Sequence, residues 1–366
     1  MMRFSLRRIW TFLAATMLLS LPVVTTHATS ASTNGRIAFD DWLTGQIYAV
    51  NPDGTGLVQL TDTGPNRWAG DPSWSPDGTH IVYERQAHGR VLLWIMDADG
   101  SNKHLLADDR PGTYSFEPVY TPDGQRVVFQ RCWQFDIHDE LHPDGGRVFT
   151  CRIFSIAVDG TDRQGITTTH PPLEVFDAHP SVSPDGTSVL FGRGNHNYDG
   201  IKNQIYVAGI DGSDPHAVTS PPLEAWYPEW SPDGEHVVFS SNCCRLGSDG
   251  YVMNADGSNV TQLTDTPFPH NDTQLTYSPD GFGIVFASDR NTEPTCPPCT
   301  TDMFLMTASG SNETMIELAV EAPHDFAWGT APLVSISSPV RGIGSARPSG
   351  LALERWKRVE DNYYSR

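Results

Sequence analysis

The amino-acid sequence predicts an all-β fold: a six-bladed β-propeller with four antiparallel strands in each blade. The first observation behind this prediction is a Ser-Pro-Asp-Gly-like turn that occurs five times. The second is the spacing of the copies, 46, 62, 48 and 47 residues, a period typical of propellers and solenoids. The third is another turn, usually Asp-Gly, between successive copies. The five main turns begin at Ser75, Thr121, Ser183, Ser231 and Ser278.

The main turn contains the residue types that a tight connection between two strands requires. Proline presets φ at the first corner, aspartate suits the second, and glycine takes the left-handed position that other side chains resist. A bulky residue such as Trp74 precedes the turn, and a β-branched or aromatic run such as residues 81–83 follows it. We therefore expect a strand, a turn and a strand at each copy.

The second turn adds two more strands to each repeat. Apolar runs precede it at residues 47–50, 93–96, 153–156, 205–208, 251–254 and 304–307. A short strand such as residues 58–61 follows it. Each repeat is therefore expected to contain strands A to D in chain order. The Pro-Asp-Gly turn joins A to B, and the Asp-Gly turn joins C to D.

The strand count predicts how the ring closes. There are six B, C and D strands but only five A strands that end in Pro-Asp-Gly, and no A strand precedes the first B strand at residues 36–39. The missing strand is expected at residues 324–329, which include Trp328 but no turn after it. A C-terminal strand that completes the N-terminal blade removes exposed sheet edges. The propeller is expected to span residues 36–330.

The two ends of the chain are expected to lie outside the propeller. Residues 1–28 combine three arginines, an apolar run and a small-residue cleavage site, which is the pattern of a secretory signal peptide. Residues 331–366 are expected to form a flexible tail, rich in Ser, Pro and Gly up to residue 350 and with a possible short helix at residues 351–364. We therefore expect a secreted, periplasmic or cell-surface protein, and a monomer. No second segment is apolar and long enough to span a membrane.

The charge of the chain argues against some partners. The net charge is −20, and removal of the first 28 residues, which contain three basic and no acidic residues, makes it −23. Such a surface repels nucleic acid and anionic lipid.

The repeats resemble the TolB-type, WD-repeat-like six-bladed propeller family. The resemblance rests on Pro-Ser-Trp-Ser-Pro-Asp-Gly at residues 72–78 and Met-Asp-Ala-Asp-Gly-Ser-Asn at residues 96–102, with their copies, and it covers residues 36–330. The five repeated turns make the resemblance imply the fold. It does not imply the function, because this fold hosts binding proteins, lyases and the propeller halves of peptidases. TolB itself has an α/β domain before its propeller, which this sequence is expected to lack, so the resemblance does not imply the Tol–Pal envelope role.

Strand parity predicts which face binds a ligand. The A–B and C–D turns are uniform and lie on one face, whereas the B–C and D–A loops vary and lie on the other, where binding residues usually gather. One residue of each A strand is expected to line the channel mouth on the variable face: Asp71, Glu117, His179, Tyr227, Gln274 and Asp325. Trp68 and Trp226 are expected to overlook that mouth and stack on a ligand.

The carboxylates and the imidazole of this ring suggest a metal site. Asp71, Glu117, His179 and Asp325 are the residue types that bind calcium or a transition metal. Two interpretations of the ring therefore remain open: a divalent-cation site and a water-filled polar channel mouth.

All six cysteines are expected to lie in B–C loops. They are expected to form disulfides, since an even number in an exported chain favours them. We expect a Cys132–Cys151 bond at the base of a long insert, and two bonds among Cys243, Cys244, Cys296 and Cys299, whose pairing the sequence leaves open. Cys296 and Cys299 also have the C-x-x-C spacing of a redox or zinc motif.

The function expected from the sequence is non-catalytic binding of a protein or glycan ligand on the variable-loop face. The alternative is a metal-assisted polysaccharide lyase or hydrolase that acts at the channel mouth. Neither H-E-x-x-H nor G-x-S-x-G occurs in the chain, which argues against a zinc protease and a serine hydrolase.

Overall fold

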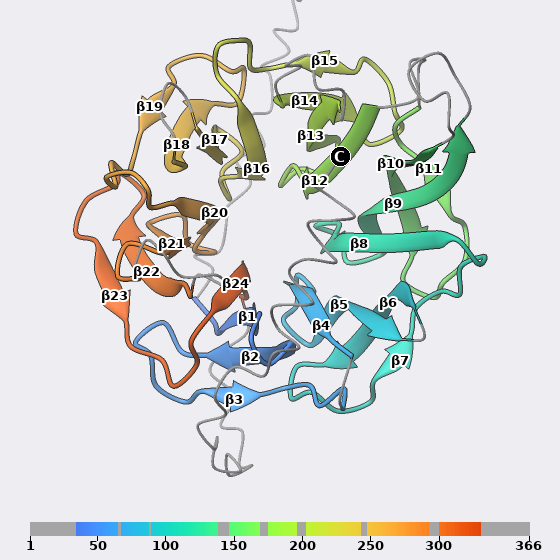
Figure 1. Ribbon diagram of the computed structural model, residues 1–366, viewed down its shortest axis with the longest axis horizontal. Coiled ribbons are helices and arrows are strands. Elements are labelled where there is room, and N and C mark those ends of the chain that lie inside the picture. The colour runs from blue at the N-terminus through green and yellow to red at the C-terminus, as the bar shows by residue number, and fades with distance from the viewer. Residues whose placement is uncertain are drawn as a thin grey trace, which may run out of the picture. The chain divides into compact units, whose positions relative to one another are not determined.

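The computed structural model describes residues 34–64, 67–87, 89–137, 146–168, 175–195, 203–242, 247–292 and 300–330. These residues form 24 strands in six four-stranded antiparallel sheets and include no helix, which confirms the predicted fold class. Figure 1 shows the six blades around a common centre, with the A strand of each blade innermost. The expected signal peptide, the expected tail and four of the cysteines (Cys243, Cys244, Cys296 and Cys299) lie outside the described residues.

The first three blades follow one another along the chain, apart from the strand that closes the ring. Blade 1 consists of β24 (Pro323–Trp328), β1 (Ile37–Asp41), β2 (Gln46–Val50) and β3 (Val58–Gln59). Blade 2 consists of β4 (Ala69–Trp74), β5 (His80–Ala87), β6 (Arg90–Asp97) and β7 (His104–Leu105). Blade 3 consists of β8 (Thr113–Tyr120), β9 (Arg126–Ile137), β10 (Gly146–Ala157) and β11 (Gln164–Gly165).

The other three blades repeat the same order. Blade 4 consists of β12 (Val175–Val182), β13 (Ser188–Asn195), β14 (Gln204–Gly209) and β15 (His216–Ala217). Blade 5 consists of β16 (Ala225–Trp230), β17 (His236–Ser241), β18 (Asp249–Asn254) and β19 (Thr261–Gln262). Blade 6 consists of β20 (Asp272–Tyr277), β21 (Gly283–Ser288), β22 (Asp302–Thr307) and β23 (Thr314–Ile316).

The hydrophobic core lies between the blades. Six buried clusters each combine side chains of two neighbouring blades; one joins Phe39 and Phe326 of blade 1 to Val285 of blade 6. Every B strand supplies one large aromatic residue that is at most 1% exposed: Phe39, Tyr83, Phe129, Phe191, Phe239 and Phe286. Because each blade buries its apolar faces only against its neighbours, the ring must close for the core to be complete.

Closure follows the predicted scheme. β24 pairs antiparallel with β1, with Ile37 opposite Trp328 and Ala38 opposite Ala327. Backbone hydrogen bonds from Gly35 N–H to the Gly329 carbonyl (2.8 Å) and from Gly329 N–H to the Arg36 carbonyl (2.9 Å) extend the pairing. The two ends of the propeller thus share one sheet, and β24 covers the edge of β1 that would otherwise be unpaired.

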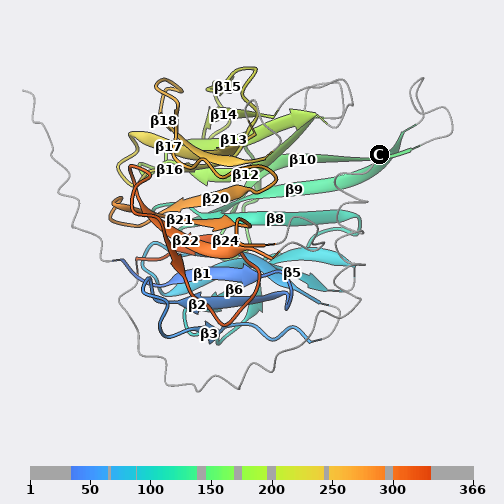
Figure 2. The ribbon, with the colours of Figure 1, turned by 60° about the vertical axis from the view of Figure 1, so that its left-hand side comes forward.

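The long hairpin of blade 3 contains the one disulfide among the described residues. Cys132 and Cys151 are bonded, as predicted, and are directly opposite each other in β9 and β10. The prediction that they lie in a loop was wrong, because the strands continue past them to Ile137 and Gly146. Figure 2 shows this hairpin extending beyond the strands of the neighbouring blades. The bond therefore joins two paired strands, and the connection between them begins further along the hairpin.

Removal of β24 should be far more damaging than removal of the residues after it. A chain that ends before His324 loses the partner strand of β1 and the buried Phe326 side chain. Loss of such a side chain alone costs about 3–5 kcal/mol. A chain that ends before Pro339 keeps all 24 strands. Thermal melting should show a large drop for the first truncation and almost none for the second; equal melting temperatures for the two chains would contradict the closure described here.

Candidate functional site

One residue in the innermost strand of every blade adopts a left-handed backbone conformation. These residues are Asp71, Glu117, His179, Tyr227, Gln274 and Asp325, with φ between 47° and 57°. Positive φ is uncommon for residues other than glycine. Each of the six lies where the pairing between the A and B strands shifts register, which is a β-bulge. A bulge turns a side chain away from the ordinary alternation of the strand.

The six bulges direct their residues into one cavity. It has a volume of about 120 Å³, and all six left-handed residues line it. Proline follows four of them, at Pro72, Pro118, Pro180 and Pro228. Proline suits the unpaired part of a bulge because it has no N–H to donate to the sheet. The ring predicted from the sequence is therefore present, and Glu229, which was not predicted, also lines the cavity.

The two predicted tryptophans are placed differently. Neither Trp68 nor Trp226 lines this cavity. The Trp68 ring instead packs beside Gly70, and a Cβ atom at that glycine would lie 3.3 Å from it.

Two acidic residues that the sequence analysis missed lie behind the ring. Asp40 on β1 is 5% exposed and Glu84 on β5 is 2% exposed. Each directly follows the core aromatic residue of its B strand, and the equivalent residues in the other blades are Gln130, Gly192, Ser240 and Ala287. A carboxyl at a B-strand position filled elsewhere by small or neutral residues was the signal that could have revealed them.

Carboxyls from blades 1 and 2 are in direct contact with one another. The Asp40 carboxyl is hydrogen-bonded to that of Asp325, and the Asp71 carboxyl to those of Glu84 and Asp325. The Oδ1 atom of Asp40 is buried and has no hydrogen-bond partner among the described residues. Two carboxyls form a hydrogen bond only when one of them holds a proton, so the cluster retains protons that isolated carboxyls would lose.

Burial and mutual repulsion raise the pKa of four of these carboxyls. Desolvation is the largest cause for each. It raises the pKa of Asp71 to about 7, with the Glu117 charge as the next cause. The pKa values of Asp40, Glu84 and Asp325 are raised well above their usual range, with further contributions from the charges of neighbouring cluster members. Desolvation likewise raises the pKa of Glu229 to about 8.

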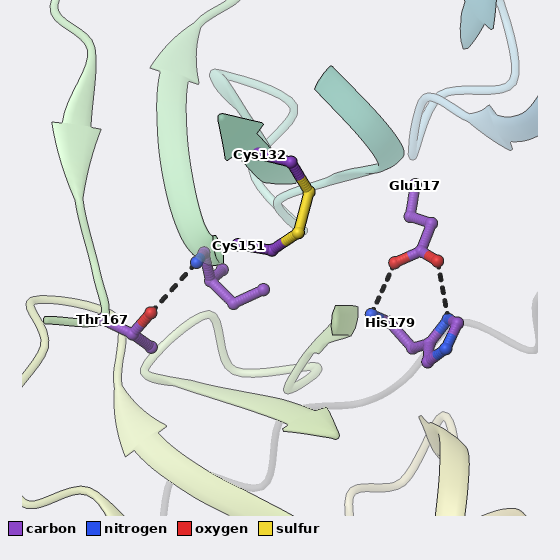
Figure 3. The surroundings of a disulfide bond; sticks show 6 residues. Glu117, Cys132, Cys151, Thr167 and His179 are labelled. Carbon is purple, nitrogen blue, oxygen red and sulfur yellow. Dashed lines mark hydrogen bonds and ion pairs between the residues drawn. A yellow bond between two sulfur atoms is a disulfide. The ribbon is translucent and has the colours of Figure 1, made fainter. Parts of the chain in front are cut away.

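Glu117 connects this acidic cluster to blade 4. Its Oε1 atom lies 2.8 Å from His179 Nδ1, and its Oε2 atom accepts a hydrogen bond of 2.6 Å from the His179 backbone N–H. Figure 3 shows both contacts near the disulfide. The His179 ring also packs on Tyr227, with the ring centroids 4.0 Å apart. The imidazole is therefore held between one carboxylate and one aromatic ring.

Backbone N–H groups of the ring are hydrogen-bonded from blade to blade. The Glu117 N–H donates to Glu84 Oε2 (3.3 Å), and the Asp325 N–H donates to Gln274 Oε1 (3.2 Å). The Gln274 N–H donates to Ser240 Oγ (3.2 Å). The bulges thus supply N–H groups that tie neighbouring inner strands together and fix the ring.

The carboxyl cluster has no lysine or arginine partner in the described part of the chain. Among the described residues, no lysine or arginine forms an ion pair with Asp40, Asp71, Glu84, Glu117 or Asp325. Nor do Asp71, Glu117, His179 and Asp325 converge on a single ion position. The one group of three ligand atoms within 4.8 Å of one another, in the part of the chain that the structure describes, is Asp233, Glu235 and His236 in an exposed turn. A cation shared by these four residues would therefore require their side chains to move.

Residues 147–319 match the family model described as the TolB beta propeller domain. In this part of the chain, the propeller resembles the TolB type. TolB from Acinetobacter baumannii has a similar structure (TM-score 0.60, 16% identity), with 81% of this chain and 66% of that chain covered. A chain of a nidogen/laminin complex is also similar (TM-score 0.56, 11% identity, 80% and 98% covered).

A curated sequence relative of this TolB-type propeller is the uncharacterized peptidase YuxL of Bacillus subtilis (strain 168). It is 27% identical over 108 residues. These residues make up 29% of this chain and only 16% of the relative, so this chain spans a small part of the relative's length. In the described part of this chain, no helix is long and apolar enough to cross a membrane.

Stability should fall as the pH rises, because the cluster holds protons in the folded state. The four raised pKa values lie above the unfolded values of about 4, so their contribution to stability is complete below about pH 4. It is lost as the pH rises through the folded values, about 7 for Asp71. His324, whose pKa is lowered, titrates below about pH 7 and does not affect the range from about pH 7 to pH 9. In that range, each proton that the folded state binds in excess of the unfolded state lowers the free energy of unfolding by about 1.4 kcal/mol per pH unit.

Urea unfolding in chelator at several pH values measures this slope. The matched variant combines Asp40→Asn with Glu84→Gln, which keeps the shapes of the side chains but removes two of the groups. Its slope should be shallower than that of the wild type. A wild-type free energy of unfolding that rises over the same range would refute the proton-holding cluster.

Proposed function

We propose that this chain is an exported, non-catalytic binding propeller that holds a cationic group of a protein ligand at the channel mouth, on the variable-loop face. The observation that carries the proposal is the set of five carboxyls, Asp40, Asp71, Glu84, Glu117 and Asp325, with no lysine or arginine in contact. Buried charge without a partner is costly. A lysine, an arginine or a divalent cation from outside would relieve that cost.

The size of the cavity favours a single group over a whole small molecule. Sites for drug-sized ligands usually have about 300–1,000 Å³, whereas this cavity has about 120 Å³. One side chain or one ion fits such a volume. A protein ligand can insert a basic side chain here and make its remaining contacts on the loops around the mouth.

Exposed aromatic residues on the variable loops support contacts of this kind. Trp42, between β1 and β2, is 44% exposed and packs against His324 with ring centroids 5.2 Å apart. Phe268, between β19 and β20, is 60% exposed. Aromatic residues are enriched where proteins bind each other. A third exposed aromatic, Phe282, lies in an A–B turn on the opposite face and has no part in this proposal.

Export is supported by two features. The sequence begins with the pattern of a secretory signal peptide, Cys132 and Cys151 are bonded, and disulfides persist in oxidising compartments. A similar propeller in a nidogen/laminin complex supports the choice of a protein partner, because its chain belongs to an assembly of two proteins.

Selection of peptides from a phage-displayed random library on the immobilised full-length protein tests the proposal. The selected peptides should be enriched in lysine or arginine. Binding of a synthesised peptide should weaken about tenfold or more when Asp71→Asn and Asp325→Asn are combined, because a buried charge pair loses one partner.

The matched control removes two carboxylates from the other face. Asp211→Asn with Asp256→Asn removes two ionised carboxylates from exposed C–D turns, which changes the net charge at least as much as the ring variant does, and should leave peptide affinity unchanged. Equal losses in the two double variants would mean that only overall charge attracts the peptides. Selection of peptides without basic residues would contradict the cationic ligand.

A further inference from the structure

A second cavity lies between blades 2 and 3, beside the Pro-Asp-Gly turns. Its volume is about 370 Å³, and its lining includes His80 and His104 of blade 2 and Tyr120, Asp123 and Gln125 of blade 3. It is on the face of the uniform A–B and C–D turns, opposite the variable loops, and the proposed protein ligand does not use it. Two histidines in one cavity suggest a different kind of ligand.

The sheet register places the two histidines on the same side of blade 2. His80 on β5 is directly opposite Asp97 on β6, and His104 on β7 is opposite Ile95, two residues from Asp97. Paired residues and residues two apart share a face of a sheet. Asp97 therefore lies between the two imidazoles, and its Oδ1 atom is 3.8 Å from His80 Nε2.

Hydrogen bonds already orient each of the three side chains. His80 Nδ1 lies 2.7 Å from Thr79 Oγ1, whose hydroxyl donates to Asp77 Oδ1 (2.7 Å). His104 Nδ1 lies 3.0 Å from the Asn102 carbonyl oxygen. Both rings thus use Nδ1–H as a donor and keep the Nε2 lone pair free. Histidines that bind metals usually donate their other N–H to a carbonyl or a similar acceptor in this way.

The carboxylate of Asp97 is oriented in the same manner. Its Oδ2 atom accepts hydrogen bonds from Asn102 Nδ2 (2.6 Å) and Ser101 Oγ (3.2 Å). The Oδ1 atom is left facing His80. Each of the three residues therefore offers one atom and has its other polar atom engaged.

The repeats provide internal comparisons, because blade 2 alone has a histidine at both positions. His236 of blade 5 corresponds to His80, but Thr261 stands at the position of His104. His216 of blade 4 corresponds to His104, but Ser188 stands at the position of His80. The sequence departs from the repeat in one blade at two positions that line one cavity.

We propose that His80, His104 and Asp97 bind a divalent transition-metal ion of the zinc type. Two imidazoles and a carboxylate suit Zn²⁺, Ni²⁺ or Cu²⁺. The three ligand atoms are not within 4.8 Å of one another as the side chains stand, so binding requires rotation of the imidazoles. The side chains of His80 and Asp97 are 47% and 37% exposed, and His104 is exposed, so rotation displaces no core residue.

The competing site is the group Asp233, Glu235 and His236 in the blade 5 turn. Its atoms are already close together, but Asp233 Oδ1 accepts hydrogen bonds from Ser231 Oγ (2.5 Å) and from the Glu235 N–H (3.0 Å). That carboxylate therefore stabilises its own turn. The experiment must distinguish the two groups.

Titration of ZnCl₂ into the chelator-stripped full-length protein, followed by calorimetry and by metal analysis after dialysis, tests the proposal. His80→Ala and His104→Ala should each remove the same one equivalent of zinc, or weaken it about tenfold or more, and the double variant should remove no further zinc. Melting temperatures in chelator should match the wild type, because all these side chains are exposed.

His216→Ala and His236→Ala are the matched controls, one for each position, and both should keep the wild-type stoichiometry. Loss of zinc in His236→Ala but not in His80→Ala would assign the metal to the blade 5 turn and overturn the proposal. The absence of any zinc binding at micromolar concentration would overturn it as well. Asp71→Asn should leave zinc binding unchanged, so the result is independent of the channel-mouth function.

Discussion

The left-handed bulge in each inner strand is the constraint on which the channel depends. A residue other than glycine pays about 1–2 kcal/mol for this conformation, and the chain accepts it six times, from Asp71 to Asp325. Without the bulge, these side chains would follow the ordinary alternation of the strand. With it, they line one cavity, while backbone N–H groups of the ring are hydrogen-bonded to side chains of the preceding blade. The same distortion therefore builds the ring and ties its blades together.

The acidic cluster lies at the closure of the ring. Asp325 belongs to the last strand and Asp40 to the first strand of the same blade, whereas Asp71 and Glu84 belong to the next blade. Their charges would repel one another at the place where the two ends of the propeller meet. Protons shared between the carboxyls reduce this repulsion in the isolated protein. A bound cation can replace those protons, so ligand binding, pH and closure act on the same group of side chains.

Much of the architecture was predictable because the repeat is local and regular. Pro-Asp-Gly turns and alternating runs predicted the strands, and the unequal strand count predicted that Trp328 would pair beside Ile37. The ring residues followed from position in the repeat. Asp40 and Glu84 were missed because their role depends on contacts between blades, which no spacing within a repeat encodes. The loop placement of Cys132 was wrong because the insert lengthens two strands before it turns.

If the channel mouth exchanges protons for a cation, calorimetric titration with CaCl₂ will detect the protons that leave. Measurements near pH 7 in two buffers of different ionisation enthalpy report the protons released on binding. We expect binding with proton release in the wild type. The Asp71→Asn variant should bind more weakly and release fewer protons, because the Asp71 carboxyl that it lacks has its pKa raised to about 7. Binding without proton release, or binding that Asp71→Asn leaves unchanged, would contradict an exchange of protons for a cation at the channel mouth.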